Sequence, residues 1–305
     1  MLPLVYHPNY SCPFPENHRF VMSKFVRLYE YICAQGIVDE QHRNLYQPTT
    51  ASLHELSVAH DPSYLKNLCG NDVDQREWRR IGLPWSQGLL DRTLTAPNGT
   101  LLAANLALEK GLACHLAGGT HHAHYDFGSG FCMLNDLAYT AKSLLATKQV
   151  SKVLIFDCDV HQGDGTASIL ANEDNAFTCS IHCEKNFPFR KYKSDLDVGL
   201  ENGLGDADYL AVVTETLNGL IAQEKPDLVL YDAGVDIWQH DSLGHLDISW
   251  QGMADRDEAV LKTCLSQHIP VVTVIGGGYD EDHDRLARRH GIVVEVANHL
   301  YHQYF

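Results

Sequence analysis

Residues 153–166 combine an apolar run with side chains that can bind a metal ion. The segment reads VLIFDCDVHQGDGT. Its first four residues are apolar, which is typical of a short strand buried on both faces. Asp157, Asp159 and His161 follow at intervals of two, so an extended backbone would turn their side chains to one side. We therefore expect Asp159 and His161 to bind one cation together; the alternative is a strand that ends in a solvated acidic loop.

Asp236 is the expected third ligand of this cation. It follows another apolar run, residues 228–231, and lies near Gly234, which permits a close approach of the backbone. Two carboxylates and one imidazole leave a position for water, and this pattern suits a catalytic Zn²⁺. The same donors also accept Fe²⁺, Co²⁺ or Mn²⁺. Taken alone, Asp236 is equally well interpreted as a helix cap or a turn residue.

The adjacent residues His121 and His122 are candidates for general acid and base catalysis, since imidazole titrates near neutral pH. Each ring needs a carboxylate on its outer nitrogen to fix its orientation and tautomer, and Asp157 and Asp164 are the available partners. Asp164 could instead cap a helix that begins near Thr166. A histidine pair without such partners is more often an accident of the surface.

Two glycine-containing segments could complete a site around these groups. Tyr279 follows three glycines after an apolar run, so its phenol could donate to a developing oxyanion; the alternative is a tyrosine packed against the rim. In GSGF, residues 128–131, Gly130 and Phe131 could form the wall of a narrow apolar tunnel, or simply a turn and a core aromatic.

The elements that would position these residues alternate along the chain. We expect strands at residues 4–7, 112–117, 153–156, 176–182, 228–231 and 271–275, and helices at residues 18–34, 87–110, 135–147, 206–223, 250–266 and 282–302. This alternation predicts one α/β domain over residues 1–305, with a mainly parallel sheet flanked by helices on both faces. The four polar segments follow strand ends, where open α/β sheets bind ligands, so we expect them to converge.

Composition narrows the classes of function. The chain has 23 basic and 39 acidic residues and a net charge of −16, which disfavours nucleic acid and favours cationic substrates. No apolar run is long enough to span a membrane, and the N-terminus lacks the pattern of a secretory signal. Nine cysteines without a framework spacing indicate reduced thiols. We therefore expect a cytoplasmic protein; its oligomeric state is open.

Taken together, these motifs resemble the histone deacetylase family, in particular its bacterial or class IV-like branch with the acetoin-utilisation and acetylpolyamine relatives. The matching segments are HPNY, ENHRF, HDPSYL, GGTHHA, GSGFCMLND, DCDVHQGDG, SIH, GVD and GGGYD. The resemblance implies the single-domain arginase/deacetylase fold. It also implies a zinc-dependent hydrolase that removes an acyl group, typically acetyl, from lysine or a small amine.

The resemblance assigns roles to individual residues. The matching positions are Asp159, His161 and Asp236 for the metal ligands, His121 and His122 for the paired histidines, Asp157 and Asp164 for their acidic partners, Tyr279 for the tyrosine that polarises the carbonyl, Gly130 and Phe131 for the acyl-lysine tunnel, and Arg19 for an internal channel. A structural K⁺ would involve Asp157, Asp159, His161 and Ser180.

Some features depart from the family pattern. Residues 70–84 do not match the loop that carries a peptide-gripping aspartate, so small acylated amines or short acyl-lysine segments are favoured over histones. Gln162 replaces a second histidine found in many members, but that histidine is not a ligand. One rival interpretation is a ureohydrolase of the same fold, which would need a second metal. The other is a non-catalytic acyl-lysine binding module, which a missing ligand, His122 or Tyr279 would favour.

Overall fold

The computed structural model describes all residues, 1–305. Its centre is one sheet of eight strands in the order β2-β1-β3-β8-β7-β4-β5-β6, and every neighbouring pair is parallel. The strands are β1 (Leu4–Val5), β2 (Leu45–Tyr46), β3 (Leu112–His115), β4 (Val153–Asp157), β5 (Ala176–Cys183), β6 (Leu196–Leu200), β7 (Leu228–Asp232) and β8 (Val271–Val274). The predicted parallel sheet is therefore confirmed.

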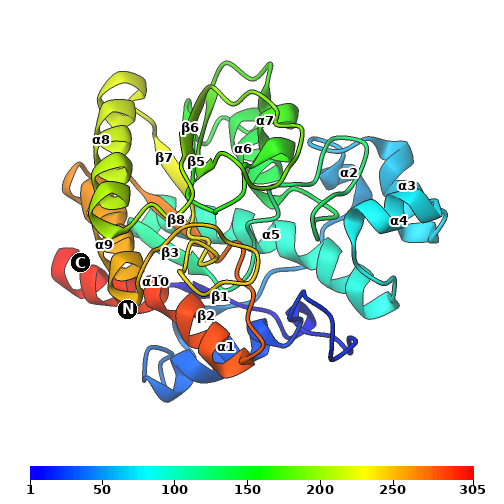
Figure 1. Cartoon of the computed structure of the whole chain (residues 1–305), viewed down its shortest axis with the longest axis horizontal. Helices are drawn as coiled ribbons and strands as arrows, with labels where there is room; N and C mark the ends of the chain where they lie inside the picture. The colour runs from blue at the N-terminus through cyan, green and yellow to red at the C-terminus, as the bar shows by residue number, and fades with distance from the viewer.

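Helices cover the sheet on both sides (Figure 1). They are α1 (Lys24–Ala34), α2 (Leu53–Leu56), α3 (Pro62–Gly70), α4 (Gln75–Ile81), α5 (Gln87–Lys110), α6 (Asp136–Ala146), α7 (Asp164–Leu170), α8 (Asp206–Glu224), α9 (Trp250–Ser266) and α10 (His283–Tyr304), with a 3₁₀ turn at Pro8–Tyr10. None of these helices is both long and apolar enough to cross a membrane.

Alternate residues of the central strands enter two separate cores. Leu154 and Phe156 of β4 join the larger cluster, whereas Val153 and Ile155 join the smaller one. This is the arrangement expected where successive side chains of a strand point to opposite faces and both faces are covered. The apolar run at residues 153–156 is thus a strand buried on both sides, as predicted.

The predicted elements differ from the observed ones mainly near the first helix and in short elements. The predicted helix at residues 18–34 begins only at Lys24, because residues 18–23 form a loop that the His18 ring ties to Phe20 and Gly82. The strand predicted at residues 4–7 is only two residues long. The two edge strands, β2 and β6, and the helices α2 to α4 were not predicted, since their apolar pattern is too short to distinguish from loop.

Candidate active site

Four neighbouring strands, β3, β8, β7 and β4, end at the same edge of the sheet, and each is followed by one of the polar segments. One cavity is lined by His121 and His122 after β3, Asp159 and His161 after β4, and Tyr279 after β8. The predicted convergence of these segments is therefore observed. Asp236, after β7, joins the same group through Asp159 and His161.

Asp159, His161 and Asp236 form a compact, buried cluster. One ligand atom from each lies within 4.8 Å of the other two. The Nδ1 atom of His161 is 3.0 Å from Asp159 Oδ1 and 3.1 Å from Asp236 Oδ2. Although burial alone would lower it, the neighbouring carboxylates of Asp159 and Asp236 raise the pKa of His161 to about 10. An imidazole held between two carboxylates is a donor set that suits a divalent cation.

The surroundings of this cluster also fit a cation. Asp236 Oδ2 is buried and makes no hydrogen bond, so one lone pair of the cluster is unsatisfied. The backbone N–H of Gly277 donates to Asp159 Oδ2 at 2.6 Å. A Cβ atom at Gly234 would come 2.6 Å from the same oxygen, so glycine is needed for this close approach.

The backbone geometry between the ligands differs from the expected extended chain. β4 ends at Asp157, and the chain then bends, with the N–H of Asp159 bonded to Asp157 Oδ1 and the N–H of His161 bonded to Asp159 Oδ1. Asp159 and His161 still converge, but the Asp157 side chain turns to His121 instead. The prediction that all three side chains point to one side was wrong, because the strand ends too early.

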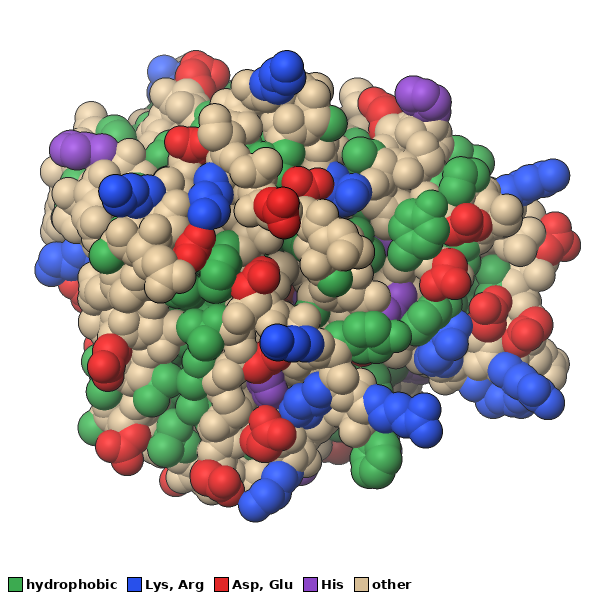
Figure 2. Space-filling model, turned by 90° about the horizontal axis from the view of Figure 1, so that it is seen from above, with side chains coloured by type: hydrophobic (Ala, Val, Ile, Leu, Met, Phe, Trp, Pro, Cys, Tyr) green, Lys and Arg blue, Asp and Glu red, His purple; other side chains and the backbone are tan.

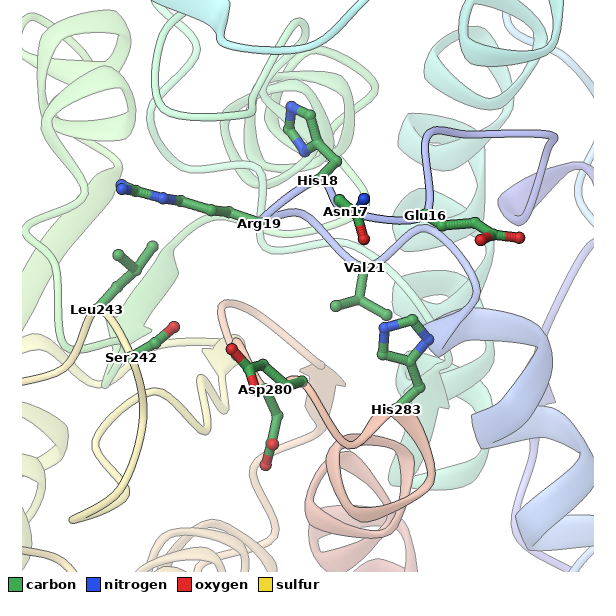
Figure 3. A pocket seen from close by; sticks show the side chains of 10 residues that line it. Glu16, Asn17, His18, Arg19, Val21, Ser242, Leu243, Asp280 and His283 are labelled. Atoms are coloured by element: carbon green, nitrogen blue, oxygen red, sulfur yellow. The ribbon is translucent and has the colours of Figure 1, made fainter.

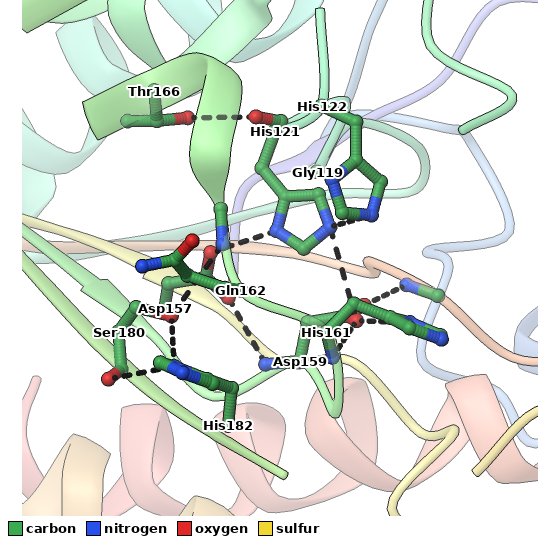
Figure 4. A network of polar contacts seen from close by, with 12 residues as sticks. Gly119, His121, His122, Asp157, Asp159, His161, Gln162, Thr166, Ser180 and His182 are labelled. Carbon is green, nitrogen blue, oxygen red and sulfur yellow. Dashed lines mark hydrogen bonds and ion pairs between the residues drawn. The ribbon is translucent and has the colours of Figure 1, made fainter. Parts of the chain in front are cut away.

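Each of the paired histidines has a buried carboxylate behind it, and Figure 4 shows the contact of His121 with Asp157. His121 Nδ1 is 2.7 Å from Asp157 Oδ2, and His122 Nδ1 is 2.6 Å from Asp164 Oδ1. The other oxygen of Asp164 lies 3.1 Å from His124 Nε2. Asp164 makes no side-chain cap to α7, which starts at this residue. The interpretation of Asp164 as a histidine partner therefore holds over the helix-cap alternative.

The two imidazoles have opposite electrostatic environments. Burial, together with the neighbouring His121, lowers the pKa of His122 to about 4. Burial would also lower the pKa of His121, but the charges of Asp157 and Asp159 raise it well above its usual value. Two titratable neighbours whose pKa values are pushed apart are a common basis for distinct acid and base roles. At neutral pH the His122 ring is uncharged, and its Nε2 atom lies 3.1 Å from Nε2 of His121.

Tyr279 is held over the cavity by a buried ion pair. Its backbone N–H donates to Asp241 Oδ2 at 2.8 Å, and Arg289 Nη2 donates to its carbonyl oxygen at 3.2 Å. Asp241 and Arg289 are themselves 3.0 Å apart and buried. Burial raises the pKa of the phenol well above its usual value, so the hydroxyl remains a hydrogen-bond donor.

The entrance is walled by two aromatic rings. Phe131 packs 5.8 Å from the ring of Tyr279, and Phe187 packs edge-on at 4.8 Å from the ring of His122. A Cβ atom at Gly130 would come 2.6 Å from the His122 ring, which explains the glycine there. Gly130 and Phe131 thus lie where a tunnel wall was expected. Phe187 was missed, although it stands in an aromatic and proline-rich segment, NFPF, that follows β5.

The internal channel assigned to Arg19 is lined by another arginine. Arg19 is exposed at the entrance, whereas Arg92 of α5 is 5% exposed and lines the inner cavity together with the buried Lys24. The assignment of Arg19 to an internal channel was therefore wrong. Arg92 was missed because an arginine inside a helical pattern is ordinarily a surface residue.

A further buried carboxylate, Asp232, was also missed. It pairs with Asp157 across β4 and β7, and neither of its oxygens has a hydrogen-bond partner. Burial and the charge of Asp157 raise its pKa well above the usual value. In the sequence DAGVD, only the second aspartate, Asp236, was predicted as a site residue. The expected K⁺ partner Ser180 lies opposite Asp157 in the pairing of β4 with β5, and K⁺ binding there stays a prediction.

Comparison with known proteins adds an independent observation. The profile of the histone deacetylase domain matches residues 18–296. The chain belongs to the histone deacetylase family. It is 47% identical to an uncharacterized protein of Picosynechococcus sp. over 98% of this chain and 99% of that protein. It is also 29% identical to histone deacetylase 2 of Arabidopsis thaliana, over 93% of this chain and 76% of that protein.

Two further relatives are each 28% identical to the chain. The chain is 28% identical to the acetoin utilization protein AcuC of Staphylococcus aureus, over 87% of this chain and 73% of that protein. It is 28% identical to a probable deacetylase of Archaeoglobus fulgidus, over 86% of this chain and 77% of that protein. Membership of the histone deacetylase family supports a deacetylase, and hence a hydrolase, with the arginase/deacetylase fold.

Proposed function

We propose that the protein is a metal-dependent deacylase that hydrolyses an acyl amide, typically an acetyl amide, of lysine or a small amine. The observation that carries this proposal is the position of His122. Its Nδ1 atom is bonded to Asp164, and its ring lines the same cavity as the metal-binding cluster and Tyr279. A base, a carbonyl-polarising donor and a cation site around one cavity are the parts that amide hydrolysis by water requires.

Asp159, His161 and Asp236 would hold the metal, for which we expect Zn²⁺, with Fe²⁺ or Co²⁺ as alternatives. A metal bound there supplies Lewis acidity to the carbonyl oxygen and lowers the pKa of water. The proposed structural K⁺ would be held around Asp157, Asp159, His161 and Ser180.

The chain's own side chains would move the protons. Neutral His122 takes a proton through Nε2 from the attacking water, while Asp164 fixes the ring through Nδ1. Tyr279 donates to the carbonyl oxygen as negative charge develops on it. When the carbon–nitrogen bond breaks, His122 returns its proton to the leaving amine. His121 and Asp157 form a second, charged pair beside this base and stabilise its neutral form.

One observation favours a second candidate, a binuclear ureohydrolase of the same fold. Ligand atoms of His121, Asp157 and Asp232 also lie within 4.8 Å of one another. However, the short bond of 2.7 Å between His121 and Asp157 already uses one oxygen of this group. Tyr279 and His122 also have no evident task in hydrolysis of a guanidinium group, so we favour the deacylase. A non-catalytic binding module is disfavoured because all the expected catalytic side chains are present.

The test combines turnover with metal content. The purified protein is loaded with one defined metal at a time and assayed on acetyl-lysine peptides, longer-acyl lysines, acetylated polyamines and guanidino compounds. We expect acyl-amine turnover with one divalent metal per chain. Two metals per chain and release of urea would instead establish the ureohydrolase.

Matched variants locate the metal. Asp159→Ala and Asp236→Ala should lose both turnover and bound metal while keeping a native circular dichroism spectrum. Asp174→Ala, at an exposed loop position, serves as the control and should keep both. Stoichiometric metal in both cluster variants would show that the metal binds elsewhere.

A further inference from the structure

The entrance to the active-site cavity has a charge opposite to that of the whole protein. A hollow of about 390 Å³ runs from His122, His161 and Tyr279 to the surface, and its lining includes Arg19, Arg79 and Arg80 but no aspartate or glutamate. The chain as a whole carries a net charge of −16. The charged side chains that line the entrance are therefore opposite in sign to the net charge on which the expected preference for cationic substrates was based.

Two of these arginines form no close ion pair. Arg19 and Arg79 are exposed, and neither is among the residues that form ion pairs within 4.0 Å. Arg80 has only a long contact of 3.5 Å with Glu77, and its guanidinium is fixed 3.8 Å above the Phe127 ring. Figure 2 shows a hollow with a histidine visible in it, edged by hydrophobic side chains, with both basic and acidic side chains on the surface around it.

The backbones that carry these arginines are tied to the tunnel wall. The N–H of Gly130 donates to the carbonyl of Arg80 at 3.2 Å, and the N–H of Phe131 donates to the carbonyl of Ile81 at 2.8 Å. His18 accepts from the N–H of Phe20 through Nδ1, so its Nε2 carries the proton that it donates to Gly82 at 3.0 Å. The end of α4 and the Arg19 loop are thereby held together beside the entrance.

A simpler role explains only part of this cluster. Arg79 and Arg80 lie in the last turn of α4, where basic side chains interact favourably with the helix dipole. Arg19 comes from a different segment, more than fifty residues earlier, and has no helix end to stabilise. Interaction with the dipole of α4 therefore does not explain why Arg19 lies at the entrance together with Arg79 and Arg80.

Further acidic side chains lie outside the lining of the entrance. Glu16, Asp280 and Glu281 line an adjacent hollow of about 630 Å³, which Arg19 also lines. Asp280 is already paired with Arg285 at 2.6 Å and Arg289 at 3.1 Å. In Figure 3, Arg19 extends toward the loop that carries Leu243, whereas Glu16 points the opposite way.

We propose that Arg19 and Arg79 select acylated amines that carry a carboxylate close to the acylated chain. This inference rests on the proposed deacylase function and names the substrate class of that same site. Guanidinium groups bind carboxylates through paired hydrogen bonds, and a basic entrance raises the local concentration of anionic substrates. The carboxylate belongs either to acidic residues that flank an acyl-lysine or to the α-carboxylate of a free acyl amino acid.

The experiment compares three acetyl-lysine peptides that differ only in flanking residues, which are aspartate, serine or lysine. A second arm compares free Nε-acetyl-lysine with its α-carboxamide. We expect kcat/KM to be highest for the aspartate peptide, chiefly through a lower KM, and the preference to weaken as salt rises. The second arm shows whether the α-carboxylate alone is enough.

The variants Arg79→Glu and Arg19→Glu should each lower the ratio of kcat/KM for aspartate over lysine peptides by roughly fivefold or more, since each exchanges an attractive exposed charge pair for a repulsive one. Arg76→Glu is the matched control. It lies on the same helix and changes the net charge equally, but does not line the entrance, so the ratio should stay at the wild-type value.

Failure of the charge selection and failure of the proposed deacylase function give different results. Equal kcat/KM for aspartate and lysine peptides at low salt, with the serine peptide turned over, would overturn the charge selection and leave the deacylase intact. If no peptide is hydrolysed, fluorescence polarisation of the labelled peptides still tests the entrance. Tighter binding of the aspartate peptide to wild type than to Arg79→Glu would then support the selection and contradict the proposed function. Equal binding would contradict both.

Discussion

Each reacting side chain of the candidate site is held by a second buried side chain. Asp164 holds His122, Asp157 holds His121, and Asp241 with Arg289 holds the backbone of Tyr279. Such support fixes ring tautomers and orientations, so the geometry needed for reaction exists before substrate binds. Loss of the reacting group and loss of its support should therefore differ in their kinetic consequences.

Removal of the Tyr279 hydroxyl should act on the transition state. Tyr279→Phe keeps the ring that packs against Phe131 but loses the donor to the developing oxyanion. We expect kcat to fall about 10²- to 10³-fold with little change in KM, the usual cost of one oxyanion donor. Steady-state kinetics on an acetyl-lysine peptide measure this. A rise in KM at unchanged kcat would instead assign the hydroxyl to ground-state binding.

The two histidines should contribute unequally. His122 is neutral and available as a base, whereas His121 is protonated beside Asp157. His122→Ala should lower kcat about 10²- to 10⁴-fold, the range for loss of a general acid–base, and His121→Ala should cost less. Single-turnover rates with metal content verified in both variants make the comparison. Wild-type turnover by His122→Ala would place the base on another residue.

At the scale of the elements, a buried histidine joins the segment before α3 to the loops after β3. His60 accepts from the N–H of Asn135 through Nε2 at 2.9 Å, so its Nδ1 carries the proton that it donates to the carbonyl of His124 at 3.0 Å. Asn135 in turn caps α6 and donates to the carbonyls of His121 and Ala123. His60 thus stabilises the loop that carries the paired histidines.

This histidine should make stability depend on pH. Burial lowers the pKa of His60 to about 4, below the value of about 6.5 in the unfolded chain. Between about pH 4 and pH 6.5 the unfolded chain binds more protons at His60 than the folded protein does. The contribution of neutral His60 to the free energy of unfolding is therefore present above about pH 6.5 and is lost as pH falls toward 4. From pH 7 to pH 5 the loss should be about 2 kcal/mol.

The variant His60→Gln isolates this contribution, because an amide can accept from Asn135 and donate to His124 without titrating. Other buried histidines also titrate, so the pH-dependent loss of stability in His60→Gln must be compared with the loss in wild type. Urea unfolding at pH 7 and pH 5 should show His60→Gln losing about 2 kcal/mol less than wild type. Equal losses in the two proteins would mean that His60 does not have its lowered pKa in the folded protein.

On the scale of the whole molecule, the nine cysteines are all free thiols. Six are buried, and only Cys12, Cys33 and Cys69 are partly accessible. Burial raises the pKa of these three thiols, which slows reaction of the thiolate at neutral pH. The sheet and its two cores therefore provide stability without covalent cross-links.

A thiol titration tests this organisation. In denaturant without reductant, Ellman's reagent should detect nine thiols per chain, and in the native protein no more than about three should react, slowly. Fewer than nine in denaturant would reveal a disulfide. Rapid reaction of more than three in the native protein would show that the buried cysteines become exposed by opening of the fold.

The sequence by itself determined six of the eight strands of the sheet and the residues of the candidate metal site. Apolar runs such as residues 153–156 reflect burial on both faces, and that pattern is a local property of the chain. Asp159, His161 and Asp236 followed strand ends, and parallel strands bring such ends to one edge whatever lies between them. These predictions needed only the pattern of apolar residues along the chain and the general rule that parallel strands end at one edge of a sheet.

Only the tertiary structure decided which side chains become partners and what charge surrounds the entrance. β4 ends at Asp157 and the chain then bends, so the Asp157 side chain turns to His121. Asp232 lies beside Asp157 because β4 pairs with β7. Arg92, not Arg19, lines the inner cavity because α5 presents that residue inward. Net charge is a sum over the whole chain, whereas the field at the entrance depends on where each charge lies, so a chain of −16 can carry an arginine-lined mouth.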